Sequence, residues 1–203
     1  MFSGDELSIR YAKRDLALTL PTVLGLTPGR AVAVQAGGNL GVYADELAQY
    51  FRAVYTFEPD AEMFRQLMHN VGSRDNAVAM RAALGDQHAM VGTTRARRDS
   101  KSGPVHDALT HISGPGIVPT LRVDDLGLDF LDVLWLDVEG HEYDVLLGAR
   151  ETMQKYRPTV VVEINEQCEI RGIQPEDIRT LLRMTGYEFV VRIKADEVYT
   201  WRK

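Results

Sequence analysis

Basic residues, cysteines and long apolar runs are all scarce in this sequence, and each scarcity excludes a class of protein. Lys and Arg total 23 against 29 Asp and Glu among 203 residues, which gives a formal net charge of −6. A protein whose main partner is nucleic acid normally carries a basic surface, so we expect no nucleic-acid partner. No apolar run approaches the length of about 20 residues that spans a bilayer, so we expect no membrane partner.

Residues 1–15 carry scattered charges and no apolar core, which is untypical of a signal peptide. Cys168 is the only cysteine, so the chain cannot form an intramolecular disulfide and suits a reducing compartment. We therefore expect a cytoplasmic protein in which Cys168 is a buried, inert thiol. No cysteine and histidine spacing typical of a zinc site occurs, and the favoured interpretation includes no metal.

Apolar segments rich in β-branched residues alternate with segments of helical periodicity over most of the chain. We expect strands at residues 31–35, 53–59, 77–84, 132–140, 158–165, 187–193 and 197–203. We expect helices at residues 41–51, 60–70, 142–156 and 175–185. This alternation indicates crossover connections, so the sequence predicts one α/β domain with a mostly parallel seven-stranded sheet and an antiparallel last strand.

Two segments depart from the alternation. Residues 1–29 are expected to form a helical extension, in which residues 5–18 have the periodicity of an amphipathic helix and Pro21 marks a break after it. Residues 92–120 are rich in Gly, Ser, Pro and Thr, and they predict an inserted loop with at most short strands. The basic segment 95–101 could meet a phosphate, but a solvated loop is the favoured interpretation.

A glycine-rich turn, QAGGNLG, comes directly after the first predicted strand, at the edge where open α/β sheets bind their ligands. Gly37 and Gly38 lack a Cβ, so the backbone can approach a ligand closely. The dinucleotide pattern G-x-G-x-x-G fails, because Asn39 and Val42 stand where glycines are required, and there is no Walker A motif. The spacing from Gly37 to Gly41 favours a nucleoside that carries a carboxylate and disfavours an NAD-dependent oxidoreductase.

Two acidic residues at predicted strand ends suit such a nucleoside. Glu58 lies 21 positions after Gly37, where a carboxylate can accept hydrogen bonds from both ribose hydroxyls. The alternative for Glu58 is a solvated acid at a strand end. Asp86 comes after the third predicted strand, where it could accept from the exocyclic amine of adenine, and a plain turn is the alternative.

The segment LDVEGHE places Asp137, Glu139 and His141 at the end of the fourth predicted strand. Each could accept a proton from a reacting hydroxyl, while helix capping and surface exposure are the alternatives. Glu163 lies in the apolar run VVVEIN, where a buried acid indicates a site role or a structural ion pair. Asp137 with Glu163 or Asn165 could also hold a divalent cation, which is not the favoured interpretation.

Several segments occur in the order seen in one known family: QAGGNLGVY, VYTFEPD, AALGD, VDDLGL, LWLDVEGHEYDVLLGA and YRPTVVVEI. Over roughly residues 30–165 the chain resembles the FkbM-type S-adenosylmethionine-dependent methyltransferases. The resemblance implies a Rossmann-like class I methyltransferase fold, which is a three-layer sandwich, with S-adenosylmethionine as the cofactor. It also implies methyl transfer to an oxygen of a small molecule or carbohydrate.

The resemblance further implies roles for individual residues. Gly37, Asn39 and Gly41 would surround the methionine portion of the cofactor. Glu58 would bind the ribose, and Asp137 would face both cofactor and acceptor.

One position departs from the family, whose turn usually begins with aspartate where this chain has Gln35. An amide oxygen could accept from the cofactor's ammonium group, but without a full negative charge. Gln35 and the long insertion therefore leave a second class of function open, a catalytically inactive binding or scaffold module. We expect the acceptor's determinants in the N-terminal helix and in residues 92–120.

Overall fold

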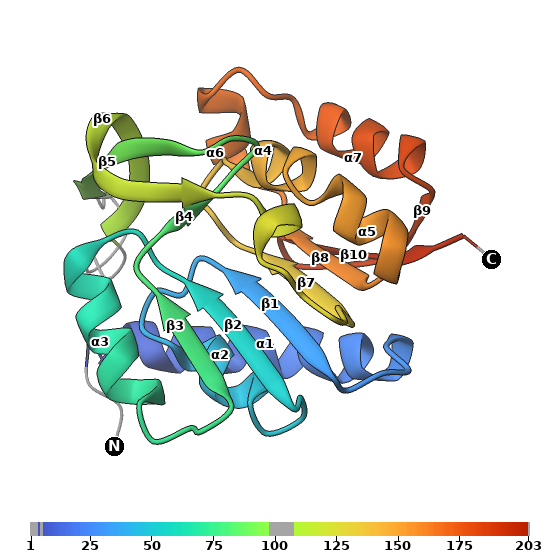
Figure 1. Ribbon diagram of the computed structural model, residues 1–203, viewed down its shortest axis with the longest axis horizontal. Coiled ribbons are helices and arrows are strands. Elements are labelled where there is room, and N and C mark those ends of the chain that lie inside the picture. The colour runs from blue at the N-terminus through green and yellow to red at the C-terminus, as the bar shows by residue number, and fades with distance from the viewer. Residues whose placement is uncertain (1–3, 5, 98–107, 203) are drawn as a thin grey trace.

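The computed structural model describes residue 4 and residues 6–97 and 108–202. Within these residues the central sheet has seven strands in the order β3-β2-β1-β7-β8-β10-β9 (Figure 1). Their bounds are β1 Val32–Ala36, β2 Ala53–Phe57, β3 Ala77–Met80, β7 Val133–Leu136, β8 Thr159–Glu163, β9 Tyr187–Ile193 and β10 Asp196–Trp201. The strands from β3 to β8 are parallel, whereas β10 is antiparallel to both of its neighbours. The predicted α/β fold with an antiparallel last strand is confirmed.

Helices cover both faces of this sheet and make it the middle layer of a three-layer sandwich (Figure 1). One layer contains α1 (Glu6–Leu26), α2 (Val42–Leu47) and α3 (Ala61–Val71). The other contains α4 (Glu142–Leu147), α5 (Arg150–Tyr156), α6 (Glu166–Ile170) and α7 (Pro175–Met184). Successive side chains of a strand point to opposite layers, so Trp135 packs toward α1 and α2 while Leu134 packs toward α4 and α5. This double coverage explains why the central strands are almost wholly apolar.

The prediction of a loop at residues 92–120 is wrong for 92–97 and 108–120, which form strands, while residues 98–107 lie outside the described part of the chain. Strand β5 (Ala89–Arg97) pairs antiparallel with β6 (Ala108–Leu121), and β6 pairs parallel with the short β4 (Ala83–Leu84). Gly92, Gly114, Pro115 and Gly116 lie at or next to the register shifts around Val91, where a β-bulge tolerates them. The resulting three-stranded sheet β4-β6-β5 stands above the carboxyl edge of the main sheet (Figure 1).

Other boundaries also differ from the sequence prediction. Helix α1 continues through Pro21, because Leu16, Leu20 and Val23 are buried against the sheet on both sides of the exposed proline. The expected strand 77–84 divides into β3 and β4, and the expected helix 142–156 divides into α4 and α5. Tertiary packing decides these details, and it has no signal in local periodicity. Helix α6 was not predicted.

Asp60, the first residue of the predicted helix 60–70, caps α3. Its Oδ1 accepts hydrogen bonds from the backbone N–H groups of Glu62 and Met63, both at 2.9 Å. Cys168 is fully buried, as expected. Among the described residues, no helix is both long enough and apolar enough to cross a bilayer.

Substitution of Gly37 tests the close contact between the ends of β1 and β7. Its φ is +86°, and a Cβ there would lie 1.7 Å from the carbonyl oxygen of Asp137. We expect Gly37→Ala to lower the free energy of unfolding by about 2–4 kcal/mol, measured by urea denaturation. Gly25→Ala is the matched control, because a Cβ on this glycine of α1 meets nothing within 4 Å. Equal effects of the two substitutions would contradict the packing described here.

Candidate active site

The glycine-rich turn after β1 is held against the end of β2 by backbone hydrogen bonds. The N–H groups of Gly37 and Gly38 both donate to the carbonyl oxygen of Phe57, at 3.0 and 2.8 Å. Gly37, Asn39 and Gly41 all have positive φ values, of +86°, +43° and +80°. This left-handed backbone turns the chain sharply into α2 and exposes its polar groups at the carboxyl edge of the sheet.

The buried side chain of Gln35 supports this turn from inside the fold. Its side chain is 1% exposed, its Nε2 donates to the carbonyl oxygen of Gly37 at 2.6 Å, and its Oε1 accepts from the Thr56 hydroxyl at 2.5 Å. Both ends of the amide are therefore occupied within the fold. We reassign Gln35 from the expected contact with a cofactor to a support of the turn.

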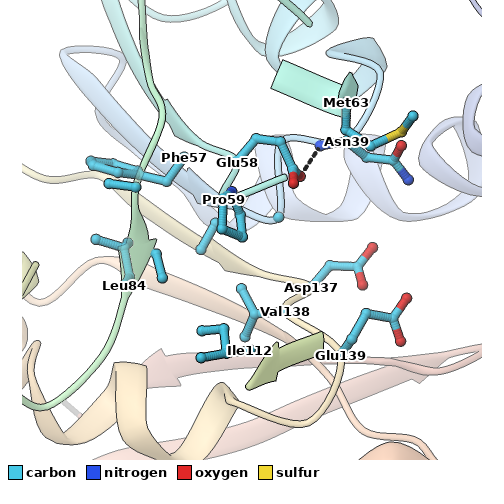
Figure 2. A pocket seen from close by; sticks show the side chains of 14 residues that line it. Asn39, Phe57, Glu58, Pro59, Met63, Leu84, Ile112, Asp137, Val138 and Glu139 are labelled. Carbon is cyan, nitrogen blue, oxygen red and sulfur yellow. Dashed lines mark hydrogen bonds between the residues drawn. The ribbon is translucent and has the colours of Figure 1, made fainter. Parts of the chain in front are cut away.

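Glu58 closes the turn on the side of β2. Its Oε2 accepts from the backbone N–H of Asn39 at 2.8 Å (Figure 2). Its Oε1 accepts from the backbone N–H of Asp60, also at 2.8 Å. The residue is only 4% exposed, which rules out the alternative of a solvated acid. Each carboxylate oxygen has a second lone pair, so a carboxyl held in this way still offers acceptors to a ligand.

A cavity opens beside Glu58. Its apolar wall comes from β2, α3, β4, β6 and the loop after β7, and it includes Phe57, Met63, Ala83, Leu84, Ile112 and Val138. The mixture of an apolar wall with a few polar groups is typical of a small-molecule site.

Asp86 lies away from this cavity. It is exposed, and it comes after Gly85, whose carbonyl oxygen packs so closely on Gly148 that a Cβ on Gly148 would lie 1.9 Å from it. This contact directs the chain after β4 toward α4, so the prediction that Asp86 meets an adenine is not supported. Backbone and side chains of Ala82, Ala83 and Leu84 line the cavity instead.

Three carboxyl groups stand side by side on the face of the sheet that α1 covers. Trp135 lies opposite Val161, and Glu163 lies opposite Asp196 in the strand register. Asp137 lies two residues after Trp135, and Glu163 likewise lies two residues after Val161. The side chains of Asp137, Glu163 and Asp196 therefore project on one face from neighbouring strands, which lie about 4.8 Å apart. We call these three residues the carboxyl row.

Burial and mutual repulsion oppose ionisation of the carboxyl row. Burial, with Glu163 nearby, raises the pKa of Asp137 well above its usual range. Burial and the negative charge of Glu139 raise the pKa of Glu163 to about 7. A hydrogen bond with Asp137 lowers this pKa, but its effect is smaller. Burial raises the pKa of Asp196 to about 6, although the Thr19 hydroxyl donates to its Oδ2 at 2.8 Å. Asp196 and Thr19 gave no recognisable signal in the sequence.

A second cavity lies over the carboxyl row, between the sheet edge and α1. Its lining includes Asp15 from α1, Tyr43 from α2, and Glu163 and Asn165 from the end of β8. The Asn165 side chain donates to Glu163 Oε2 at 2.6 Å and so orients this carboxyl. The two cavities share Gly37, Asn39, Asp137 and Glu139 in their linings, so they meet at these residues.

The loop after β7 orients Asp137 and Glu139 at this junction. Figure 2 shows both carboxyls directed to the same side of the cavity. Buried Glu142 holds the loop, because its Oε1 accepts from the N–H groups of Val138 at 3.0 Å and Gly140 at 3.3 Å. A Cβ at Gly140 would lie 2.6 Å from a backbone oxygen of α6, so only glycine fits there. The acidic cluster suggested a site, but it did not distinguish Glu142 as its support.

His141 does not join the acids that precede it in sequence. It is 7% exposed, its Nδ1 lies 3.4 Å from Asp144 Oδ2, and it lines neither of the two cavities. The left-handed backbone at Glu139 and Gly140 turns the chain before His141, so the alternation of side chains along a strand no longer applies to this residue. The expected proton-acceptor role of His141 is therefore not supported. In the part of the chain that the structure describes, no group of three or more His, Cys, Asp or Glu is arranged to hold a metal.

Comparison with known proteins agrees with this geometry. The family described as the Methyltransferase FkbM domain matches residues 35–189. The chain belongs to the FkbM methyltransferase family. The match extends from the glycine turn through the carboxyl groups of β7 and β8, so the predicted family membership is confirmed.

One relative of this FkbM-family chain is the 2-O-methyltransferase NoeI of Sinorhizobium fredii (strain NBRC 101917 / NGR234). It is 30% identical over 158 residues, which cover 68% of this chain and 64% of NoeI. The chain thus spans less than two thirds of the length of this relative.

Two solved structures have a similar fold. FkbM from Methylobacillus flagellatus KT has a TM-score of 0.52 at 17% identity, over 84% of this chain and 43% of its own. The N-methyltransferase NodS from Bradyrhizobium japonicum WM9 has a TM-score of 0.55 at 11% identity, over 98% of this chain and 99% of its own. At these identities the likeness establishes the class I methyltransferase fold alone.

The role of Gln35 in the FkbM-family turn can be tested by introducing the acid that the family usually has there. Gln35→Asp removes the donor to Gly37 and places a carboxylate in a buried position. We expect the free energy of unfolding to fall by about 1–3 kcal/mol in urea denaturation. Gln49→Asp, an exposed position just after α2, is the control. A more stable Gln35→Asp protein would contradict the assigned role.

The raised pKa of Glu163 predicts how stability depends on pH. The folded state binds this proton more tightly than the unfolded state, so the stabilisation is full below pH 4.5 and is lost as pH rises toward 7. Across this pH interval the free energy of unfolding of the unsubstituted chain should fall by on the order of 2–3 kcal/mol. We expect Glu163→Gln to abolish this fall. Urea denaturation of the ligand-free protein at several pH values measures it.

The matched control for this pH series is Glu169→Gln, which replaces an exposed glutamate on α6. Its pH profile should overlie that of the unsubstituted chain. A Glu163→Gln profile with the same slope as the control would show that protonation of Glu163 does not cause the pH dependence of stability.

Proposed function

We propose that this chain is an S-adenosylmethionine-dependent methyltransferase that methylates a hydroxyl group of a small molecule, with carbohydrates as the acceptor class. The observation that carries the proposal is the junction of two cavities at Asp137 and Glu139. One cavity offers the groups that a nucleoside needs, and the other is lined by carboxyls. The printed name of NoeI, a 2-O-methyltransferase, supports a hydroxyl acceptor.

The residues of the first cavity fit the adenosine part of the cofactor. Glu58 is oriented by two backbone N–H groups and can accept hydrogen bonds from two ribose hydroxyls. Met63, Ala83 and Leu84 provide apolar surface for the adenine ring. At Gly37 the turn approaches Asp137 so closely that no side chain fits.

The carboxyls beside the turn fit the charged end of the cofactor. S-adenosylmethionine carries its reactive methyl group on a positively charged sulfur, and the transfer leaves a neutral thioether. A positive charge beside Asp137, Glu139 and Glu163 relieves the repulsion among these acids. The three residues therefore favour the cationic cofactor over the neutral product.

Methylation of a hydroxyl also requires a group that accepts its proton. Asp137, Glu139 and Glu163 line the second cavity and can each do so. Glu163 suits this role best, because a carboxyl with a pKa of about 7 binds a proton more tightly than an ordinary one and is still partly ionised near neutral pH. Asn165 holds this carboxyl in place through its side-chain amide.

The proposal predicts a pH-dependent preference for the cofactor over its product. We expect S-adenosylmethionine to bind increasingly better than S-adenosylhomocysteine between pH 6 and 8, by up to about tenfold for each proton released. The cause is ionisation of the carboxyls near the sulfonium. Isothermal titration calorimetry with both ligands in buffers of different ionisation enthalpy measures the affinities and the protons released.

Two substitutions separate binding from chemistry. We expect Glu58→Gln to weaken both ligands about tenfold or more, and Glu163→Gln to retain S-adenosylhomocysteine binding but lower kcat for a hydroxyl acceptor at least about a hundredfold. Exposed Glu169→Gln is again the control. A chain that binds neither ligand overturns the proposal, and cofactor binding without methyl transfer to any acceptor favours the inactive binding module.

A further inference from the structure

Helix α1 forms a wall of the second cavity although it lies outside the segment that matches the family, residues 35–189. Ser8, Tyr11, Ala12 and Asp15 all line this cavity. Their spacing of three and four positions places them on one face of the helix. The same helix buries Leu16, Leu20 and Val23 in the hydrophobic core. Helix α1 therefore both lines the cavity and packs against the sheet.

Side-chain contacts hold this wall in a defined position. The Thr19 hydroxyl donates to Asp196 Oδ2 at 2.8 Å, which joins α1 to the carboxyl row. Just after the helix, the hydroxyls of Thr27 and Thr159, at the start of β8, are hydrogen-bonded to each other at 2.9 Å. The residues of α1 that face the cavity are therefore built into the site.

Asp15 controls the charge of the wall. It forms an ion pair with Lys194 in the β9–β10 turn and another with Arg14 at 3.0 Å. The Arg14 guanidinium also lies over the Tyr11 ring, 4.9 Å from its centroid. These two cations flank the cavity without lining it, and the single carboxylate of Asp15 pairs with both and offsets one of their two charges.

The described lining of the second cavity contains no Lys, Arg or His. Its polar groups are the carboxyls of Asp15, Asp137, Glu139 and Glu163, together with amides and hydroxyls. Carboxylates accept hydrogen bonds from hydroxyl groups, but they repel a phosphate or a second carboxylate. A ring that carries several hydroxyls suits this lining, and the half-exposed Tyr11 offers an aromatic surface beside it.

We propose that α1 is the acceptor-selecting wall of this site, and that Tyr11 and Asp15 admit a neutral polyhydroxylated ring while rejecting its anionic counterpart. The inference rests on the proposed methyltransferase function. It adds the determinant of selectivity, which is the negative charge that Asp15 places in the cavity lining and against Arg14 and Lys194. Loss of that charge leaves two cations beside the cavity with no partner from α1 and makes an anionic acceptor acceptable.

The test uses pairs of probes, one neutral and one anionic, with the same ring hydroxyls. Methyl hexopyranosides and the corresponding methyl hexuronides share their ring hydroxyls and differ in a CH₂OH or carboxylate group. Release of S-adenosylhomocysteine from S-adenosylmethionine gives kcat and KM for each probe with the full chain. We expect the neutral probes to be methylated with kcat/KM at least about tenfold above that of the uronides.

Three variants locate the determinant. Asp15→Asn should reduce the preference for the neutral probe by about tenfold, and Tyr11→Ala should raise KM for it by about tenfold with kcat little changed. Glu6→Gln, an exposed acid on the same helix that does not line the cavity, should change neither. Calorimetric binding of S-adenosylhomocysteine should stay within about twofold in all three variants, which shows that they fold.

Each result bears on one claim. Equal methylation of neutral and anionic probes overturns selection by charge, and unchanged kinetics in Asp15→Asn and Tyr11→Ala overturn the role of α1. Cofactor binding without methylation of any probe overturns the neutral ring as acceptor and leaves the cofactor assignment standing. Failure to bind S-adenosylmethionine overturns the proposed function and this inference with it.

Discussion

The contact between the turn after β1 and the end of β7 is the constraint on which this site depends. Gly37 lies against the carbonyl oxygen of Asp137, with no room for a side chain between them. Because β1 and β7 are neighbours in the sheet, this contact joins the two turns that carry the ligand-facing groups. Glu58 holds the turn from one side and Glu142 holds the loop of Asp137 from the other. The meeting of the two cavities follows from this arrangement.

The carboxyl row lowers the stability of the folded chain. Three acids on adjacent strands, partly buried and facing one another, oppose folding whenever they are ionised. Glu197, a buried acid elsewhere in the sheet, instead pairs with Arg179 at 2.7 Å. The contrast between a paired acid and the carboxyl row is typical of a functional site, where charge is arranged for a ligand at the expense of stability.

The sequence predicted the sheet, its parallel character and most of its helices, because alternation between strand and helix periodicity is a local property. Glu58 and Asp137 were also predictable, since they come after buried strands at the edge where ligands bind. Asp196 was not, because its position beside Glu163 depends on how β10 pairs with β8. Residue spacing carries no information about that register.

Two expected site roles lack structural support for the same physical reason. Gln35 and His141 were expected in the site from their positions in motifs, but a side chain's role depends on its direction. Gln35 points into the fold, where Thr56 and Gly37 satisfy its amide. His141 comes after two residues with left-handed backbone, which removes it from the face that strand alternation assigned. Composition likewise missed the β5–β6 hairpin, since a bulge accommodates glycine and proline within paired strands.

The place of β10 in the sheet has a consequence for how the molecule is made. Residues 196–201 come after the other strands of the described chain, yet they lie between β8 and β9 instead of at an edge. Until the ribosome has synthesised β10, β8 has an open edge, and neither Asp196 nor its bond with Thr19 exists. Helix α1 is synthesised long before β10, and the two elements meet through this bond. The carboxyl row is therefore complete only after β10 has been synthesised and has inserted beside β8.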